Sequence, residues 1–302
     1  MTSITFPNDF PSCDKMISTL KVTFEKSWRI PMDIEDVENW LNNFSGEFYS
    51  KEDERRIALW LLCNFTYYGD IEINHLCAVL FHNLMHKLAV DMNLTCALDV
   101  DNVLKKTVFT SIGSASESGG LMLYHFRQEA NLSIDRFVFP IASEISNSDI
   151  IVCIDDVILS GGTAARFFYN NKNLLEGKNI FYLSLISTKE SVKKLEKLNI
   201  PVISCSTLDE RSKVFSDESL CFYKFPEIKK FARDIAEGYG LKIEPSNPLG
   251  YKDGQYSFGF FYNIPNNTLP IFWSSQNWTP IFARKEKYQN ETQARRQYGF
   301  FI

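Results

Sequence analysis

This sequence lacks long apolar runs, a secretory signal pattern and the paired cysteines of zinc-binding or disulfide-rich proteins. No apolar run approaches the roughly 18 residues that a membrane-spanning helix needs, and the N-terminus lacks the basic-then-apolar pattern of a secretory signal. The seven cysteines are scattered and include no CxxC pair, which argues against zinc sites and a disulfide framework. We therefore predict reduced thiols, a cytoplasmic location and no membrane association.

Two common nucleotide-binding loops are also absent. The chain contains no G-x-x-x-x-G-K-[ST], and the first predicted strand-to-helix turn lacks G-x-G-x-x-G followed by an acid. Some other α/β protein that binds nucleotides or phosphate is therefore the least favoured interpretation of the sequence. His82 and His86 are spaced by one helical turn, but no third metal ligand follows. A bare histidine pair is a weak motif, so we predict no metal site from it.

Positive charge is scarce in the first third of the chain. Residues 1–100 hold 8 Lys or Arg against 15 Asp or Glu, and the whole chain of 302 residues carries a net charge of −5. Binding to nucleic acid requires clustered Lys and Arg that neutralise phosphates. We therefore do not expect nucleic acid to bind through residues 1–100, whereas a protein partner would suit these residues.

The order of predicted elements indicates a helical segment followed by an α/β core. Apolar residues at helical spacing predict three helices in the first 95 residues after a looser lead-in, which suggests a helical or winged-helix-like domain. From residue 96, strands and helices alternate, which predicts a parallel sheet with right-handed crossovers. The predicted helices of both parts are 14–26, 33–44, 50–67, 71–92, 121–130, 163–175 and 189–198. The predicted strands are 106–113, 136–140, 150–154, 179–187 and 200–206.

The last third of the chain is more irregular. A short strand is predicted over 220–225 and a helix over 226–237, which Gly238 and Gly240 would stop. An aromatic segment with prolines and asparagines follows. These patterns divide the chain into a helical domain at 1–95, an α/β core at 96–244 and a C-terminal hood at 245–302.

The most informative stretch is IIVCIDDVILSGGTAARFF, residues 150–168. Five apolar residues predict a buried strand, and the carboxylates of Asp155 and Asp156 follow it. The residues Ser160-Gly161-Gly162-Thr163 then lead into a predicted helix. The N–H groups at a helix start bind anions, and glycine lets the backbone approach a phosphate closely. Together these groups could hold a sugar phosphate, with the loop on the phosphate and the carboxylates on ribose hydroxyls.

This stretch resembles the PRPP-binding signature of type I phosphoribosyltransferases. The resemblance covers residues 150–163 and implies a parallel sheet flanked by helices. It also implies that Asp155 and Asp156 are the catalytic pair that holds the ribose 2′ and 3′ hydroxyls. Ser160, Gly161, Gly162 and Thr163 would then cradle the 5′-phosphate, and Mg²⁺ would accompany the pyrophosphate. The competing interpretation is a strand-turn-helix corner whose aspartates only cap the helix.

A second loop lies where that family places its pyrophosphate loop. It follows the strand predicted at 106–113 and precedes an apolar helix. A basic residue often serves such a loop because pyrophosphate is strongly anionic, but this loop carries Glu117 and no Lys or Arg. The candidate pyrophosphate loop consists of Gly113, Ser114, Ala115, Ser116, Glu117 and Ser118. Its composition leaves turnover open and is also compatible with an ordinary surface loop.

The plan of the whole chain resembles the phosphoribosyltransferase-like proteins of bacterial conflict, or antiphage, systems. In those proteins a helical region precedes the transferase domain, and an aromatic segment like Pro265–Pro270 follows. Two functions remain open. The first is phosphoribosyl transfer to a base or nucleotide-like acceptor, with release of pyrophosphate. The second is a catalytically inactive member of the fold that acts as a PRPP or nucleotide sensor or as a regulatory protein-binding module. In either case we expect an oligomer and a protein partner that binds through the N-terminal helices.

Overall fold

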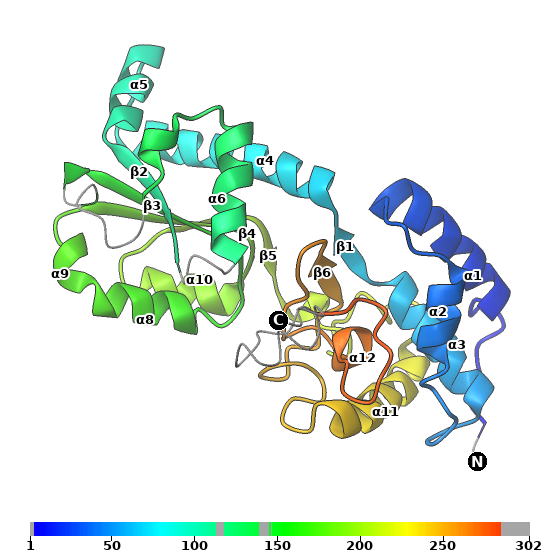
Figure 1. The fold of residues 1–302 in the computed structure, drawn as a ribbon. Coiled ribbons are helices and arrows are strands. Elements are labelled where there is room, and N and C mark those ends of the chain that lie inside the picture. The colour runs from blue at the N-terminus through cyan, green and yellow to red at the C-terminus, as the bar shows by residue number, and fades with distance from the viewer. Residues whose placement is uncertain (1–2, 113–117, 139–144, 146, 285–302) are drawn as a thin grey trace, which may run out of the picture. The chain divides into compact units, whose positions relative to one another are not determined.

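The computed structural model describes residues 3–112, 118–138, 145 and 147–284, and its described part divides into two compact units (Figure 1). One unit runs from Tyr68 to Leu220. The other joins the residues up to Tyr67 with those from Cys221 onward. These boundaries differ from the expected ones at residues 95 and 244, because the two ends of the chain contribute to the same core.

A four-stranded parallel sheet is the centre of the unit 68–220. Its strands lie in the order β2-β3-β4-β5, and each neighbouring pair is parallel, so the predicted parallel sheet is confirmed. The strands are β2 (Thr107–Ser111), β3 (Ile150–Ile158), β4 (Asn179–Thr188) and β5 (Val202–Leu208). The strand predicted at 136–140 is wrong over its described part: Ile134–Arg136 form a 3₁₀ turn, and only Phe137 bridges to β2.

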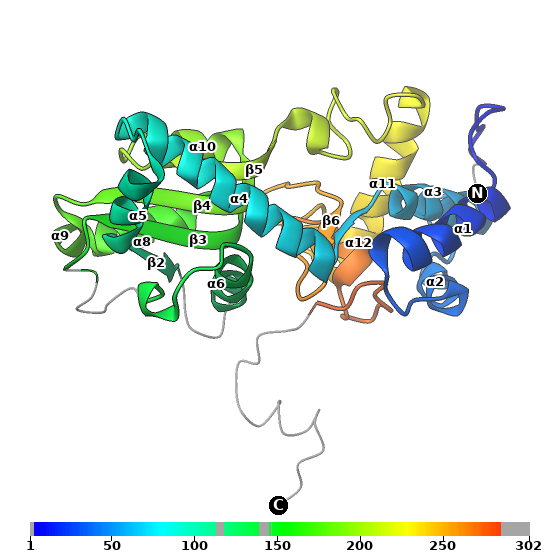
Figure 2. The same cartoon turned by 90° about the horizontal axis from the view of Figure 1, so that it is seen from above.

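Helices cover both faces of this sheet (Figures 1 and 2). The helices α4 (Asp70–Asp91) and α6 (Ser118–Glu129) pack on one face, while α8 (Gly162–Asn170), α9 (Lys172–Leu175) and α10 (Lys189–Glu196) pack on the other. A further helix, α5 (Ala97–Lys105), leads into β2. Because both faces are covered, the first five residues of β3, Ile150 to Ile154, are all buried and all apolar.

The thiol of Cys153 lies inside this core. It packs with Ile151, Tyr182 and Phe168 on the face of α8, and burial raises the pKa of Cys153 to about 12. A thiol with so high a pKa carries almost no thiolate at neutral pH and is unreactive. All seven cysteines are free in the structure, in agreement with the predicted reduced state.

The other unit is built from helices of both chain ends. From the N-terminal part come α1 (Cys13–Val22), the π-helical turn η1 (Thr23–Trp28), α2 (Ile34–Leu41) and α3 (Lys51–Cys63). The C-terminal part contributes α11 (Pro226–Ile243) and α12 (Pro270–Trp273). The strands β1 (Thr66–Tyr68) and β6 (Phe258–Phe260) pair in a small sheet. Asp33 and Ser50 cap the starts of α2 and α3 with their side-chain oxygens.

Aromatic contacts join the two chain ends. The ring of Trp40 stacks on Phe272 at 5.9 Å, and its indole N–H donates to the Ile271 carbonyl at 2.7 Å. Phe65 stacks on Phe282 at 4.5 Å. The third predicted N-terminal helix, α4, does not complete a module with α2 and α3, because its buried residues face α6 and the sheet of the other unit.

Two predictions for the segment after residue 219 are wrong. Residues 220–225 form turns instead of a strand, and the rings of Phe222 and Phe225 pack individually around Trp60. The helix α11 continues through Gly238 and Gly240 to Ile243. A Cβ at Gly238 would lie 2.3 Å from the Phe48 ring, and one at Gly240 would lie 2.1 Å from the Pro248 carbonyl oxygen. These glycines allow close packing and do not end the helix.

We expect Gly240→Ala to destabilise the protein by about 2 kcal/mol, because overpacking against a backbone carbonyl outweighs the gain of about 1 kcal/mol in helix propensity. Gly162→Ala is the matched control, because the nearest atom to its added Cβ is Ser160 Oγ at 3.6 Å. We expect its stability to be unchanged or slightly higher. Urea unfolding of both variants measures the difference, and a stabilised Gly240→Ala would contradict the packing argument.

Among the helices in the described part of the chain, none combines the length and the apolar character needed to cross a bilayer. The longest helix in that part, α4, spans 22 residues and includes charged residues such as Asp70, Glu72 and Lys87.

Candidate functional site

The acidic pair lies within strand β3 and not after it, which corrects the strand end predicted at residue 154. Ser111, the last residue of β2, pairs with Ile154, so β3 continues past the end of its neighbour. On the other side Asp155 pairs with Ser184 of β4. The two aspartates therefore emerge at the carboxyl edge of the parallel sheet, the edge at which open α/β sheets bind ligands.

Each aspartate accepts hydrogen bonds from its surroundings. Asp155 Oδ2 accepts from the Tyr182 hydroxyl at 2.9 Å, and Asp155 Oδ1 accepts from the Asp156 N–H at 2.9 Å. Asp156 is only 4% exposed, and its Oδ1 accepts from the Val157 N–H at 2.8 Å. These bonds fix the orientation of both carboxyl groups before any ligand arrives.

The surroundings of Asp155 shift its pKa. Burial raises the pKa of Asp155 well above its ordinary value, and the neighbouring Asp156 carboxylate raises it further, while the Tyr182 hydrogen bond opposes the shift. Asp155 as a whole residue is partly exposed to solvent, but its carboxyl group lies against Tyr182 and Asp156. Burial and Asp155 likewise raise the pKa of Tyr182. Carboxyl groups with raised pKa values in this kind of position are typical of functional sites.

The predicted phosphate loop joins β3 to α8. Gly161 has φ of 62° and is the N-cap of α8, so its left-handed conformation favours glycine. The Gly162 N–H donates to Ser160 Oγ at 3.4 Å, and the Thr163 side chain is exposed in the first turn of the helix. The first N–H groups of a helix have no partner within that helix, and the dipole there favours an anion. Strand, acidic pair, loop and helix start thus form one continuous unit.

Three side chains at or near the start of α10 donate hydrogen bonds to backbone carbonyls at the end of β3 and in the loop. These contacts were not predicted from the sequence. The donors are the hydroxyl of Thr188, the hydroxyl of Ser191 and the ammonium group of Lys194. These groups donate to the carbonyls of Leu159 at 2.6 Å, Ile158 at 2.8 Å and Ser160 at 3.2 Å respectively. Thr188 and Ser191 also form the capping box of α10, a pattern that would have located the helix start but not its contact with the loop.

The candidate pyrophosphate loop is described only at its end. Gly113, Ser114, Ala115, Ser116 and Glu117 lie outside the described residues, and Ser118 begins α6. Gly119 packs so closely on β2 that a Cβ there would lie 2.7 Å from Ser111 Cβ. The start of α6 is therefore attached to the carboxyl end of β2, beside the residue that pairs with Ile154.

The predicted hood segment belongs to the other unit and is held by its own contacts. The Asn267 side-chain N–H donates to the Tyr251 carbonyl at 2.8 Å, and the Thr268 hydroxyl donates to the Phe258 carbonyl at 2.7 Å. Gly250 and Gly254 approach the Asn267 backbone closely. Within this unit the segment therefore acts as a packed turn.

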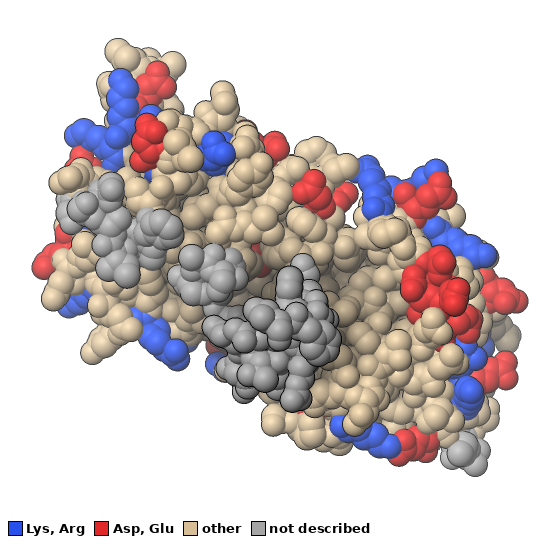
Figure 3. Space-filling model, in the orientation of Figure 1, with Lys and Arg blue, Asp and Glu red and all other residues tan. Residues whose placement is uncertain are grey.

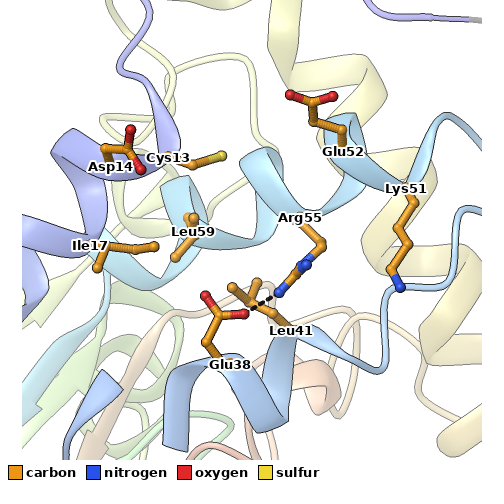
Figure 4. A pocket seen from close by; sticks show the side chains of 9 residues that line it. All are labelled: Cys13, Asp14, Ile17, Glu38, Leu41, Lys51, Glu52, Arg55 and Leu59. Atoms are coloured by element: carbon orange, nitrogen blue, oxygen red, sulfur yellow. Dashed lines mark hydrogen bonds and ion pairs between the residues drawn. The ribbon is translucent and has the colours of Figure 1, made fainter. Parts of the chain in front are cut away.

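A separate cavity of about 400 Å³ lies among α1, α2 and α3 (Figure 4). Its wall includes the ion pair between Arg55 and Glu38. None of the residues predicted to bind PRPP lines it. The lining residues are Cys13, Asp14, Ile17, Glu38, Leu41, Lys51, Glu52, Arg55 and Leu59.

Within the described ranges, no group of three or more His, Cys, Asp or Glu side chains is arranged to hold a metal ion. His82 and His86 are exposed on α4.

Comparison with known proteins identifies a family for this chain. A family model described as PRTase-CE matches residues 37–284. Similar solved structures include orotate phosphoribosyltransferase from Aeropyrum pernix, with 15% identity and a TM-score of 0.26, where the match covers 35% of this chain and 62% of that one. They also include the UMP synthase of Leishmania donovani, with 12% identity and a TM-score of 0.28, covering 61% of this chain and 37% of that one.

Each of these matches spans less than two thirds of the solved chain. No curated protein matches the sequence. The family model, in contrast, covers well over half of the chain and includes the whole strand-loop-helix unit that carries Asp155, Asp156 and the Ser160–Thr163 loop. The chain belongs to the PRTase-CE family.

Proposed function

We propose that this protein binds PRPP, or a nucleotide with a ribose 5-phosphate group, at the carboxyl end of β3. We further propose that it transfers the phosphoribosyl group to a base or nucleotide-like acceptor and releases pyrophosphate. The observation that carries the proposal is the acidic pair at the sheet edge, followed at once by a left-handed glycine and the start of α8.

Each part of the site suits one part of the ligand. The backbone N–H groups of the loop and the hydroxyls of Ser160 and Thr163 would donate to the 5′-phosphate. Asp155 and Asp156 would accept hydrogen bonds from the ribose 2′ and 3′ hydroxyls. A hydroxyl that donates to Asp155 favours its charged form, which would offset part of the raised pKa.

Magnesium is proposed as the companion of the ligand's phosphates. Mg²⁺ prefers hard oxygen donors and is usually held by one or two carboxylates together with substrate phosphates and water. The adjacent carboxylates of Asp155 and Asp156 fit this donor set when the phosphates of PRPP complete it. The ion would neutralise the charge that develops on the leaving pyrophosphate.

The chain's own residues have a positioning role in the proposed transfer. Pyrophosphate leaves C1 of the ribose, an acceptor nitrogen attacks the same carbon, and the transition state has oxocarbenium character. Holding the ribose and phosphate rigidly aligns C1 with the acceptor, which lowers the entropic part of the barrier. The carboxylates lie on the ribose side, where their negative charge stabilises the developing positive charge.

Isothermal titration with PRPP and Mg²⁺ tests the binding step, and a pyrophosphate-release assay with a panel of bases and nucleotides tests the transfer. We expect saturable binding that requires Mg²⁺, and release that depends on one class of acceptor. If PRPP and ribose 5-phosphate both fail to bind, the proposed site is wrong.

A sensor without turnover is the second candidate function. The observation that favours it is Glu117, which stands in the candidate pyrophosphate loop where a basic residue would bind pyrophosphate better. Binding without release for every acceptor in the panel would select it. Figure 3 shows acidic side chains over the N-terminal helices. Asp33, Glu35 and Asp36, at the start of α2, are exposed. A protein partner with a basic surface would suit this region. We propose antiphage defence as the setting of either function.

A further inference from the structure

We infer that Lys194 of α10 is a positioning residue that sets the anion-binding face of the Ser160–Thr163 loop. The inference rests on the proposed function of that loop. It starts from three hydrogen bonds. The consecutive carbonyls of Ile158, Leu159 and Ser160 each accept a hydrogen bond from a side chain at or near the start of α10.

The direction of these carbonyls fixes the direction of the loop's N–H groups. A trans peptide is planar, so the carbonyl of one residue and the N–H of the next point to opposite sides of the chain. Because the carbonyls of Leu159 and Ser160 point toward α10, the N–H groups of Ser160 and Gly161 point away from it. Successive N–H groups that share a side form an anion-binding concavity, and the start of α8 adds to it.

Lys194 differs from the other two donors because it brings a charge. Thr188 and Ser191 are also the capping box of α10, so their contacts serve that helix as well. Lys194 takes no part in the cap. Its ammonium group donates to the Ser160 carbonyl at 3.2 Å, and its stem lies against Gly161, where an added Cβ would be 3.3 Å from Lys194 Cδ. The positive charge therefore lies on the α10 side of the loop, next to the residues that would hold the phosphate.

Two effects follow for an anionic ligand. The charge-assisted hydrogen bond polarises the 160–161 peptide and makes the Gly161 N–H a better donor. The ammonium group would also attract the phosphate electrostatically across the loop. The distance is short and the surroundings are partly buried, so solvent screens this attraction only weakly. Both effects depend on the contact with Ser160 and not merely on the net charge of α10.

The neighbouring Lys193 provides a matched control. It is exposed on the same helix one residue earlier, so Lys193→Met removes the same charge without removing the contact. Lys194→Arg keeps both a donor and a charge. The test is titration of the wild type and of Lys194→Met, Lys194→Arg and Lys193→Met with PRPP and with ribose 5-phosphate, each with Mg²⁺, alongside thermal melts.

We expect Lys194→Met to weaken binding of both ligands by about tenfold, as for a lost charge-assisted hydrogen bond. Lys194→Arg and Lys193→Met should stay within about twofold of the wild type, since one keeps the contact and the other never made it. Equal losses for Lys194→Met and Lys193→Met would overturn the inference, as would wild-type affinity in Lys194→Met. Because ribose 5-phosphate lacks pyrophosphate, loss of its binding locates the effect at the 5′-phosphate side. A wild type that binds neither ligand would instead refute the proposed function.

Discussion

Replacing both Asp155 and Asp156 by Asn should abolish PRPP binding while the protein stays folded. Each carboxylate is proposed to accept hydrogen bonds from ribose hydroxyls, and losing two such charged acceptors costs more than about 100-fold in affinity. Asn keeps an oxygen that can accept from the Asp156 and Val157 N–H groups, the bonds that now orient the carboxyls. The fold should therefore survive, as circular dichroism and a thermal melt will show.

Asp149→Asn is the matched control for this pair. Asp149 stands just before the opposite, N-terminal end of β3, is largely exposed and pairs with Lys106. We expect the affinity for PRPP to be unchanged when it is replaced. Titration calorimetry of the two proteins decides the matter, and full affinity in the double variant would show that the carboxylates do not hold the ribose.

The single variant Asp155→Asn adds a test of the charge in this pair. Its carboxyl has a raised pKa in the folded state, so the folded protein binds this proton more tightly than the unfolded chain does. By linkage, that contribution to stability is present at low pH and is lost as the pH rises through the folded pKa. The melting temperature of the wild type should therefore fall relative to Asp155→Asn as the pH rises from about 4 toward neutrality. A difference independent of pH would contradict the assigned shift.

The elements that build this site could be predicted because their signals are local. The apolar run Ile150–Ile154 reflects burial on both faces of a parallel sheet, and Gly161 reflects a left-handed turn at a helix start. The predicted strand end was wrong: β3 ends at Ile158 and so carries Asp155 and Asp156 inside it. Strand pairing beyond the end of β2 decides that end, and no residue in the stretch signals it.

The contacts behind the loop could not be predicted because their partners are distant in the sequence. Leu159 and Thr188 are 29 residues apart, and Ser160 and Lys194 are 34 apart. The spacing of α10 residues indicates a surface helix, and only the folded sheet brings its start beneath the loop. For the same reason, the amphipathic pattern of 189–198 correctly predicted a helix but did not predict that this helix contacts the loop.

Long-range packing also explains the errors in dividing the chain. Local rules treat Gly238 and Gly240 as helix stops, but the approach of Phe48 and of the Pro248 backbone requires glycine there. Trp40 and Phe272 are 232 residues apart in the sequence, yet their rings stack in one core. The periodicity of a sequence does not show that the two ends of a chain will pack together. For this reason we predicted three consecutive domains, whereas the structure divides into two units, one of which is discontinuous in the sequence.

Replacing Glu54 by Gln should be the most destabilising single change proposed for the unit that contains the chain ends. Glu54 is 0% exposed, and its two oxygens accept from four donors. Glu54 Oε1 accepts from the N–H groups of Phe48 and Tyr49 at 2.7 and 3.0 Å. Glu54 Oε2 accepts from the Gly46 N–H at 2.8 Å and from the Tyr239 hydroxyl at 2.6 Å. One buried carboxylate thus joins α3, the 46–49 loop and α11.

The amide of Gln cannot reproduce this arrangement. Its NH₂ group would face one pair of donors and leave buried N–H or O–H groups without an acceptor, which costs about 3 kcal/mol in total. Glu52→Gln, in the exposed first turn of the same helix, is the matched control and should change stability by less than about 0.5 kcal/mol. Urea unfolding followed by tryptophan fluorescence measures both, since Trp40 and Trp60 lie in this unit. Equal midpoints for the two variants would mean that the loop and α11 are held by their aromatic packing alone, with the carboxylate contributing little.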